Sequence, residues 1–380
     1  GKISGLKECW SSQLGWNDKM FQLPWILDIW DFRSKQKLMD SGIYLMKDIR
    51  EEHIGDIQLS SDGALTRTER QWLQVRKAVD NDPTPFVNIE GLKRELDKFV
   101  FPLHFIDFET SMVAIPFFHG RRPYEQIAFQ FSHHVVNSDF SIEHKGQYLC
   151  EKKGVFPNFE FVRKLRAELE NDQGSIFRYA AHENTVLNQI MAQLEEAQKS
   201  DVPDKQSLID FIKTITHGSN HEGDRDMIDL LKLVKQYYYH PLMGGSNSLK
   251  YVLPAILNSS DYLQEKYSRP IYGKNSSIRS LNYDDGWVWI KKDPSGAVIN
   301  PYELLPPLFE GIADDQIEQF LMKSNIQEGG AAMTAYAKMQ FASITDTERK
   351  SIIKGLLKYC ELDTLAMVMV WEYWNNMIVN

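Results

Sequence analysis

The pattern of apolar and polar positions changes near residue 100 of the chain. Before that point, apolar residues recur at helical spacing in "KQKLMDSGIYLMKDIREEHIG" and in "TRTERQWLQVRKAVDND". These stretches predict a small helical segment over residues 1–99 that ends near "NDPTP". After it the pattern becomes α/β, and we expect one larger domain over residues 100–380.

Three strands are predicted where the larger domain begins. Apolar runs favour strands at 102–109, 125–136 and 140–149, and the turn-like "NSD" joins the last two. Short connections between successive strands are typical of an antiparallel meander.

The pattern then alternates between helix and strand. "FEFVRKLRAEL" is amphipathic at helical spacing, "SIFRYAAH" favours a strand, and "NTVLNQIMAQLEEAQ" favours a second helix. The resulting order, β-β-β-α-β-α, is that of a ribonuclease H-like mixed sheet flanked by helices. The fold class is therefore predicted as α/β.

Later parts of the chain are less uniform. "GGSNSLKYVLPAIL" predicts a helix begun by a serine, which stops near Pro254 only if the proline breaks it. Residues 260–345 are expected to form an irregular insertion or cap, with a hairpin in "DDGWVWIKKDPSGAV". "TERKSIIKGLLKYCELDTLAMVMVWEYW" is strongly apolar at helical spacing and predicts a late helix.

Two acids interrupt the first predicted strand, "PLHFIDFET". Asp107 and Glu109 are two positions apart, so the alternation of a strand points both carboxylates to the same side of the sheet. Unpaired like charges cost several kcal/mol when they are desolvated. A positive group is therefore expected between them, unless the strand lies at an edge and both acids are solvated.

Two further segments carry acids that suit the same site. Glu183 in "YAAHENTVL" lies where a strand passes into a helix, and Tyr359 and Asp363 in "YCELD" are one helical turn apart. Residues at i and i+4 point the same way, so a phenol and a carboxylate can reach one site. Alone, Tyr359 would be interpreted as packing, Asp363 as solvated, and Glu183 as an acid stabilised by the helix dipole.

Taken together, these motifs resemble the tyrosine-containing branch of the DEDD exonuclease superfamily. The resemblance rests on D-x-E on the first strand, an acid that opens a helix after "YAAH", and Y-x-x-x-D on a late helix. "HFIDFET", "RRPYEQIAFQFSHH" and "GSNSLKYVLPAIL" are also similar to a bacterial family described only as a conserved domain of unknown function. The similarity covers roughly residues 100–375.

The resemblance implies a two-metal phosphodiesterase that acts as a 3′→5′ exonuclease on single-stranded DNA or RNA. In such a site Asp107, Glu109, Glu183 and Asp363 would hold two Mg²⁺ or Mn²⁺ ions, for which oxygen ligands are suited. Tyr359 would orient the attacking water without having to ionise.

The second motif departs from the family pattern. That motif usually has Asp, with Asn a few residues before it, whereas this chain has Glu183 and Ala180 at those positions. Asp229 in "MIDLL" is a second candidate for the fourth carboxylate, ranked below Glu183. The departure leaves open a rival function, that of a catalytically decayed module that binds nucleic acid or protein within a larger nuclease.

Four residues are candidates for substrate binding. Arg121, Arg122 and Gln126 in "RRPYEQ" could face a phosphate backbone, although a solvated loop is an equal alternative. Lys250, which follows the glycines of "GGSNSLK", could contact a phosphate. The adjacent His133 and His134 face opposite sides of a strand, so packing is expected for both rather than metal binding.

Composition narrows the class of protein. The net charge of -9 argues against wholesale neutralisation of nucleic-acid phosphates, but not against a site where metal ions supply the positive charge. No apolar run long enough for a membrane span and no signal peptide are evident, so we expect a cytoplasmic protein with no membrane partner.

The three cysteines are far apart and support neither a zinc site nor a disulfide framework. "GLKECW" is similar to the linker that follows an upstream nuclease module in some relatives, in which case Cys9 would be an orphan ligand and the chain a fragment.

Overall fold

The computed structural model describes residues 4–305 and 330–379. The chain divides into two compact units, which are described separately. The first unit comprises Gly1–Lys93 and Leu233–Ala255, and the second comprises Arg94–Lys232 and Ile256–Asn380. Residues 233–255 thus belong with the N-terminal segment, although they are distant from it in sequence.

The first unit is built from short helices around a small apolar core. Its helices are α1 (Gly5–Leu14), α2 (Lys35–Asp40), α3 (Glu51–Ile54) and α4 (Arg67–Val79), and β1 (Phe86–Val87) pairs with β7 (Tyr238–Tyr239). The long α4 starts at a capping box, in which Thr66 accepts from the amide of Glu69 and the Glu69 carboxylate accepts from the amide of Thr66.

The helical prediction for "KQKLMDSGIYLMKDIREEHIG" is only partly right. The segment contains α2, a single 3₁₀ turn at Met46–Asp48 and α3, with turns between them. Gly42 adopts φ +78°, in the left-handed region that interrupts a helix, and Ser41 ends α2 just before it. The apolar residues at helical spacing instead enter the core from separate turns, as Leu38, Met46, Ile49 and Ile54 do.

The second unit contains a seven-stranded mixed sheet in the order β6-β5-β2-β3-β4-β9-β8. Its strands are β2 (Leu103–Ser111), β3 (Ile127–Val136), β4 (Ile142–Leu149), β5 (Ile176–Arg178), β6 (Ile228–Asp229), β8 (Tyr272–Gly273) and β9 (Ile278–Arg279). The predicted meander is confirmed, because β2, β3 and β4 pair in antiparallel fashion, whereas β5 runs parallel to β2. The fold is therefore α/β, with the strand and helix order expected of a ribonuclease H-like sheet.

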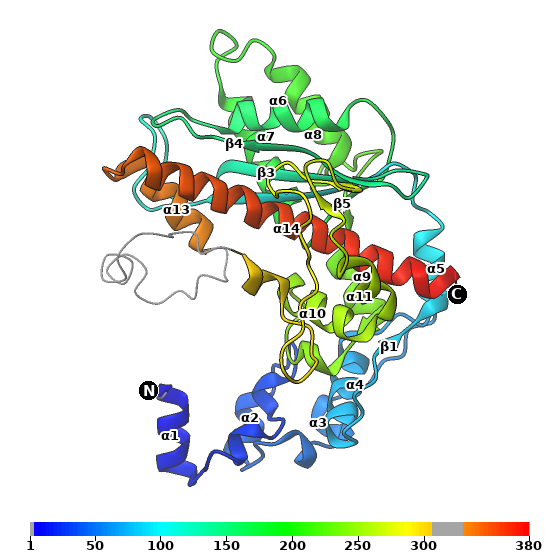
Figure 1. The fold of residues 1–380 in the computed structure, drawn as a ribbon. Coiled ribbons are helices and arrows are strands. Elements are labelled where there is room, and N and C mark those ends of the chain that lie inside the picture. Colours follow the sequence, from blue (N-terminus) through cyan, green and yellow to red (C-terminus); the bar gives the residue numbers. More distant parts are fainter. Residues whose placement is uncertain (1–3, 306–329, 380) are drawn as a thin grey trace. The chain divides into compact units, whose positions relative to one another are not determined.

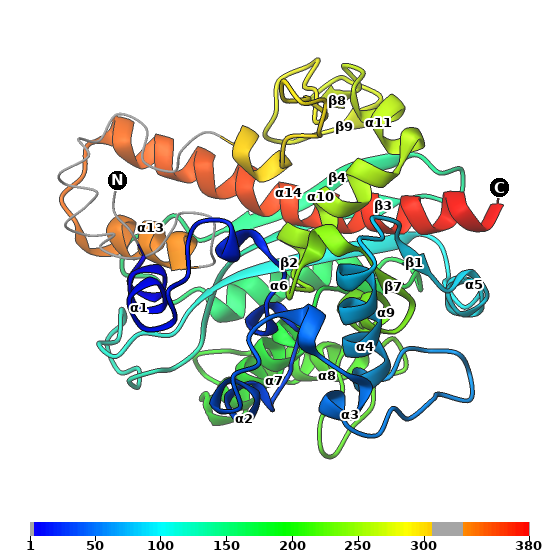
Figure 2. The same ribbon diagram turned by 90° about the horizontal axis from the view of Figure 1, so that it is seen from below.

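Helices cover both faces of this sheet (Figure 1). On one face, apolar residues of β2 and β3 pack against α6 (Asn158–Leu169), α7 (His182–Glu196) and α8 (Lys205–Ile215). On the other face lie α13 (Gly330–Phe341) and the 34-residue α14 (Asp346–Val379), which confirms the predicted late helix. Figure 2 shows α14 running across β2 and β3.

Other helices lie near the unit boundaries or in the predicted insertion: α5 (Ile89–Leu96), α9 (Leu230–Tyr237), α10 (Leu249–Ser259) and α11 (Asp261–Tyr267). The helix α10 continues through Pro254, so this proline does not break it. Burial of Val252, Leu253, Ile256 and Leu257 offsets the cost of a proline inside the helix.

One prediction of local structure is right only in part, and a second is wrong. The strand predicted for "SIFRYAAH" ends at Arg178, because the chain turns through Ala180 and α7 already begins at His182. The hairpin predicted for "DDGWVWIKKDPSGAV" is reduced to a single antiparallel bridge between Lys292 and Val298.

The region predicted as an insertion, residues 260–345, is partly regular. Its described part contains α11, β8, β9, a 3₁₀ turn at Pro301–Leu304 and the whole of α13, while residues 306–329 lie outside the described residues. Within the described ranges, no helix is both long and apolar enough to span a bilayer.

Candidate metal centre

The strand β2 directs its two acids to the face covered by α14. Ile106 and Phe108 pack into the core beneath α6 and α7, so the alternating Asp107 and Glu109 point to the opposite face. Ile106 is fully buried and Phe108 nearly so. The expected same-side arrangement of the two carboxylates follows from this alternation.

The neighbouring strand ties α14 to the sheet directly beside the two acids. Ser132 is the ladder partner of Asp107, and its hydroxyl lies 2.8 Å from the hydroxyl of Thr364 on α14. Gln130 is the ladder partner of Glu109, and its side-chain amide donates to the carbonyl of Leu356 over 2.8 Å. Both contacts fix the helix at the level of the acids.

A β-bulge lies next to Glu109. The register between β2 and β3 shifts between Glu109 and Thr110, so Phe129 is an extra residue on β3. The shift lets Gln130 and Ser132 face α14 on one side of the bulge, while Phe129 packs on Tyr336 of α13 on the other. Bulges of this kind re-aim side chains beside functional sites.

Three carboxylates from the two elements meet. Asp107, Glu109 and Asp363 each offer an oxygen, and these oxygens all lie within 4.8 Å of one another. Two oxygens that contact one divalent ion at about 2.0–2.6 Å lie at most about 4–5 Å apart, so the set has the dimensions of a shared ion. Carboxylate oxygen is also the donor type that Mg²⁺ and Mn²⁺ prefer.

Glu183 approaches the same cluster from α7. It lies in the first turn of that helix, is 2% exposed, and its Oε2 has no hydrogen-bond partner within the described residues. Its charge acts on Asp107, and that of Asp363 acts on it. A buried carboxylate oxygen without a partner costs free energy, which a bound cation would remove.

The pKa values of two of these acids, Asp107 and Glu183, are raised. Burial raises the pKa of Asp107 well above its ordinary value, and the charges of Asp363, Glu183 and Glu109 raise it further. Burial also raises the pKa of Glu183 to about 8, although the nearby Arg178 guanidinium opposes the rise. The strand and two helices therefore assemble a site whose charged form needs a positive partner.

Tyr359 lies on α14 one turn before Asp363 and is 8% exposed. Burial raises the pKa of its phenol far above neutrality, and the charges of Asp363, Glu109 and Asp107 act in the same direction. The hydroxyl thus stays protonated, as a hydrogen-bond donor or acceptor rather than a base.

One residue of the site was not predicted. The hydroxyl of Tyr302, in the 3₁₀ turn Pro301–Leu304, donates to Oδ1 of Asp363 over 2.6 Å, and its ring centroid lies 6.1 Å from that of Tyr359. The side chain is 6% exposed. No motif in "NPYELL" indicates this role, because the contact depends on how a chain segment 61 residues away folds back.

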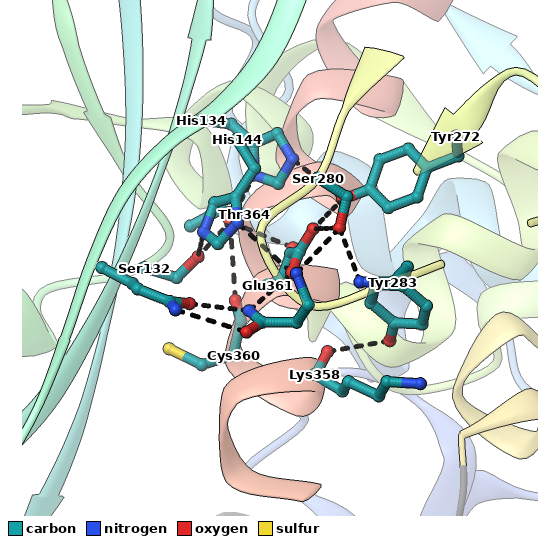
Figure 3. A network of polar contacts seen from close by, with 12 residues as sticks. Ser132, His134, His144, Tyr272, Ser280, Tyr283, Lys358, Cys360, Glu361 and Thr364 are labelled. Atoms are coloured by element: carbon teal, nitrogen blue, oxygen red, sulfur yellow. Dashed lines mark hydrogen bonds and ion pairs between the residues drawn. The ribbon is translucent and has the colours of Figure 1, made fainter. Parts of the chain in front are cut away.

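A buried polar network holds α14 from its opposite side (Figure 3). Glu361 is fully buried and accepts hydrogen bonds from Tyr272, Ser280 and Asn282 over 2.5, 2.5 and 2.7 Å. Nδ1 of His144 lies 3.2 Å from its Oε2, at ion-pair distance. Burial would raise the pKa of Glu361, but these partners keep it below its ordinary value, so this acid is charged and satisfied where the metal-site acids are not.

Asp229 supports the backbone near Glu183. Its Oδ1 accepts from the amides of Ala180 and Leu231 over 3.0 and 2.9 Å, and its Oδ2 lies 3.4 Å from Arg178. The first of these bonds helps to hold Ala180 at φ +81°, a conformation that residues with a Cβ rarely adopt. These contacts fit a residue that positions the turn before α7. Glu183 acts electrostatically on Asp107, but it is not among the three acids whose oxygens lie within 4.8 Å of one another.

Of the four candidate substrate residues, the two arginines have partners within the chain. Arg121 lies 3.3 Å from Glu125 and stacks over Phe156, and Arg122 pairs with Glu196 over 2.7 Å. Gln126 is buried. Lys250 belongs to α10 and is half-buried.

The two adjacent histidines on β3 are fully buried and face opposite sides of the sheet, as expected. His133 lies 3.2 Å from Glu168 of α6, and His134 lies 2.7 Å from the hydroxyl of Thr364 on α14.

Comparison with known proteins gives one match. The model of a family described as a domain of unknown function, DUF2779, matches residues 104–248. The matched segment includes Asp107, Glu109 and Glu183, but ends before Tyr302 and α14. Neither the curated proteins nor the solved structures gave a match. The chain thus contains a segment similar to a family without an assigned activity, over a shorter range than the residues 100–375 expected from the sequence.

Proposed function

We propose that the second unit is a metal-dependent phosphodiesterase, and that it removes nucleotides from single-stranded DNA or RNA in the 3′→5′ direction. The observation that carries this proposal is the convergence of Asp107, Glu109 and Asp363 within 4.8 Å, with the unpartnered carboxylate oxygen of Glu183 beside them. The direction and the single-stranded substrate rest on the resemblance of the sequence motifs to DEDD exonucleases. The proposed setting is the cytoplasm.

The four carboxylates would hold two Mg²⁺ or Mn²⁺ ions. When bound, such ions activate a water molecule and stabilise the leaving oxygen of a phosphodiester. The hydrogen bonds of Gln130 and Ser132 to α14 would keep three of these acids, Asp107, Glu109 and Asp363, at fixed positions relative to one another. The charged carboxylates repel one another, and bound cations would offset the free energy of this repulsion.

Tyr359 would act on the attacking water through its hydroxyl. Because its phenol remains protonated, it can accept or donate one hydrogen bond and so fix the direction of attack. It is not suited to take a proton from water at neutral pH, so proton removal would fall to a carboxylate or to bulk water.

The direct test uses the purified chain, end-labelled oligonucleotides and Mg²⁺ or Mn²⁺. We expect stepwise shortening from the 3′ end, and a loss of more than about 100-fold in Asp107→Asn and in Asp363→Asn, because even outer-sphere changes cost 10–100-fold at metal sites. Asp139→Asn is the matched control, since Asp139 lies in an exposed turn and bonds only locally to Ser141. Activity that survives both site variants would refute the assignment.

A decayed binding module is the alternative, suggested by Glu183 in place of the usual Asp. Calorimetric titration with Mn²⁺ separates the two, because an active site should bind about two ions and a decayed one should have lost affinity. The buried oxygen of Glu183 without a hydrogen-bond partner favours the active site. Burying such an oxygen costs free energy, and a site that no longer binds metal would gain nothing in return.

A further inference from the structure

Lysines gather around a tryptophan on the second unit. We call the residues Lys274, Trp287, Lys291, Lys354 and Lys358 the Trp287 surface. Nζ of Lys358 lies 4.5 Å from the ring centroid of Tyr283 and 5.4 Å from that of Trp287, and Nζ of Lys291 lies 5.9 Å from that of Trp287. Lys274, Lys291 and Lys354 are exposed, Trp287 is half-buried and Lys358 is buried.

The local charge is positive on an acidic chain. Burial lowers the pKa of Lys358, and the charges of Lys354 and Lys274 lower it further, so these cations act on one another. Three acids lie among them: Asp284 pairs with Lys274 over 3.1 Å, Asp285 accepts from the amide of Asn275, and the charge of the buried Glu361 acts on Lys358. The four lysines outnumber these three acids, whereas the whole chain carries a net charge of -9.

The Trp287 surface is linked to the metal centre through α14 and Tyr283. Lys358 directly precedes Tyr359 on the helix, and the hydroxyl of Tyr283 donates to the carbonyl of Lys358 over 3.0 Å. The charge of Asp363 also contributes, after burial and Glu361, to raising the pKa of Tyr283. Tyr283 therefore contacts Lys358 and at the same time lies within electrostatic range of Asp363.

We propose that the Trp287 surface binds single-stranded nucleic acid, with lysines on the phosphates and the indole against a base. This inference rests on the proposed function, for which it names a substrate-binding surface. A single strand offers both charged phosphates and exposed base faces, and stacking on an aromatic ring tolerates any sequence. An acidic peptide would use the charges but not the indole.

Binding can be measured without catalysis. A 5′-fluorescein-labelled dT₁₂ is titrated with the full chain in EDTA, and the Kd is obtained from fluorescence anisotropy over a range of salt concentrations. We expect Lys291→Ala and Lys354→Ala each to raise Kd by about 3–10-fold and to reduce the salt slope by about one. Trp287→Ala should raise Kd by about 10-fold, and Trp287→Phe should restore most of the affinity.

Lys292→Ala is the matched control. Lys292 is an exposed lysine next to Lys291, but it belongs to the bridge with Val298, whereas the lysines described over the Trp287 ring are Lys291 and Lys358. Equal losses from Lys291→Ala and Lys292→Ala would overturn the proposal, as would a Kd that no variant changes. Polyglutamate that displaces the oligonucleotide at equal charge concentration would also overturn it, because the surface would then recognise charge alone.

The two proposals fail in different ways. If dT₁₂ binds through the Trp287 surface but no metal supports cleavage, the phosphodiesterase assignment fails and the binding surface stands. If cleavage occurs while the lysine and tryptophan variants bind normally, only the present inference is refuted. Lys291→Ala and Lys354→Ala change exposed side chains, so the test remains decisive even if Trp287→Ala fails to fold.

Discussion

The hydroxyl of Tyr302 donates a hydrogen bond of 2.6 Å to Oδ1 of Asp363. This contact joins a 3₁₀ turn in the predicted insertion to a carboxylate on α14. Partners of metal-binding side chains fix the orientation of the ligand and the position of its lone pairs. Tyr302 is thus placed to orient Asp363, although the sequence motifs did not include it.

We predict that Tyr302→Phe weakens Mn²⁺ binding by about 10-fold and lowers kcat more than it raises KM, because it frees the Asp363 carboxylate to rotate. Calorimetric titration with Mn²⁺ gives the first quantity and oligonucleotide hydrolysis gives the second. Tyr283→Phe is the control, since Tyr283 is equally buried and bonds to the same helix, but to the carbonyl of Lys358. If both variants lose Mn²⁺ affinity equally, Tyr302 acts only by stabilising the helix.

Much of the second unit could be predicted from local pattern. Alternation in "HFIDFET" placed Asp107 and Glu109 on one face, and the i, i+4 spacing placed Tyr359 and Asp363 on one side of a helix. These relationships depend on residues close in sequence, where backbone geometry alone decides. The strand order around β2 followed from short connections in the same way.

The parts that could not be predicted depend on distant contacts. Tyr302 reaches Asp363, and Ser280 reaches Glu361, only because residues 274–305 fold along α14. The broken helices near Met46 result from tertiary packing that overrides helical spacing. The bulge at Phe129 depends on the register between β3 and β2, and the sequence of β3 alone does not determine that register.

The half-buried Asp107 and the fully buried Glu361 lie on either side of the same helix and should respond to neutralisation in opposite ways. Asp107 lies among carboxylates that raise its pKa, so Asp107→Asn should increase the free energy of unfolding of the metal-free chain at pH 9 by about 1 kcal/mol. The same variant should lose Mn²⁺ binding. Denaturant unfolding in EDTA measures the change.

Glu361→Gln should instead lower the free energy of unfolding by about 3 kcal/mol. The substitution removes the charge opposite His144 and places an amide group among donors from Tyr272, Ser280 and Asn282. If Glu361→Gln is neutral in the same denaturant experiment, the buried network contributes nothing to the placement of α14.

The response to Mn²⁺ should depend on pH. The pKa of Glu183 is raised to about 8 in the folded chain, above its ordinary value of 4.5, so the folded state holds an extra proton between these pH values. The contribution of Glu183 to the free energy of unfolding of the metal-free chain is at its maximum below about pH 4.5. It is lost as the pH rises towards 8. Metal ions favour the charged form, so the increase in Tm with Mn²⁺ should grow from pH 6 to pH 8.

Glu183→Gln removes the titrating group and should flatten that dependence. Tm is measured by differential scanning at several pH values, with and without Mn²⁺, for both chains. An increase in Tm that is constant with pH in the unaltered chain would contradict the raised pKa of Glu183.

A second pH dependence should come from the buried histidines, with the opposite sign. Burial lowers the pKa of His104 to about 4, and the nearby His133 lowers it too, although Asp172 opposes the shift. His104 becomes protonated near pH 6.5 in the unfolded chain, but only near pH 4 in the folded chain. Its contribution to the free energy of unfolding is therefore at its maximum above pH 6.5 and is lost as the pH falls to 4. A shift of this size corresponds to about 3 kcal/mol.

His104→Asn should reduce the slope of unfolding free energy against pH between 6.5 and 4, measured by urea unfolding in EDTA. The absolute stability of this variant should also fall, because Asp172 and His133 lose the partners that they have 2.8 and 2.9 Å away. His53→Asn is the control, because His53 lies in the short α3 and bonds only to the amide of Arg50. An unchanged slope in His104→Asn would mean that the acid sensitivity arises elsewhere, with His134 the next residue to test, since burial lowers its pKa as well.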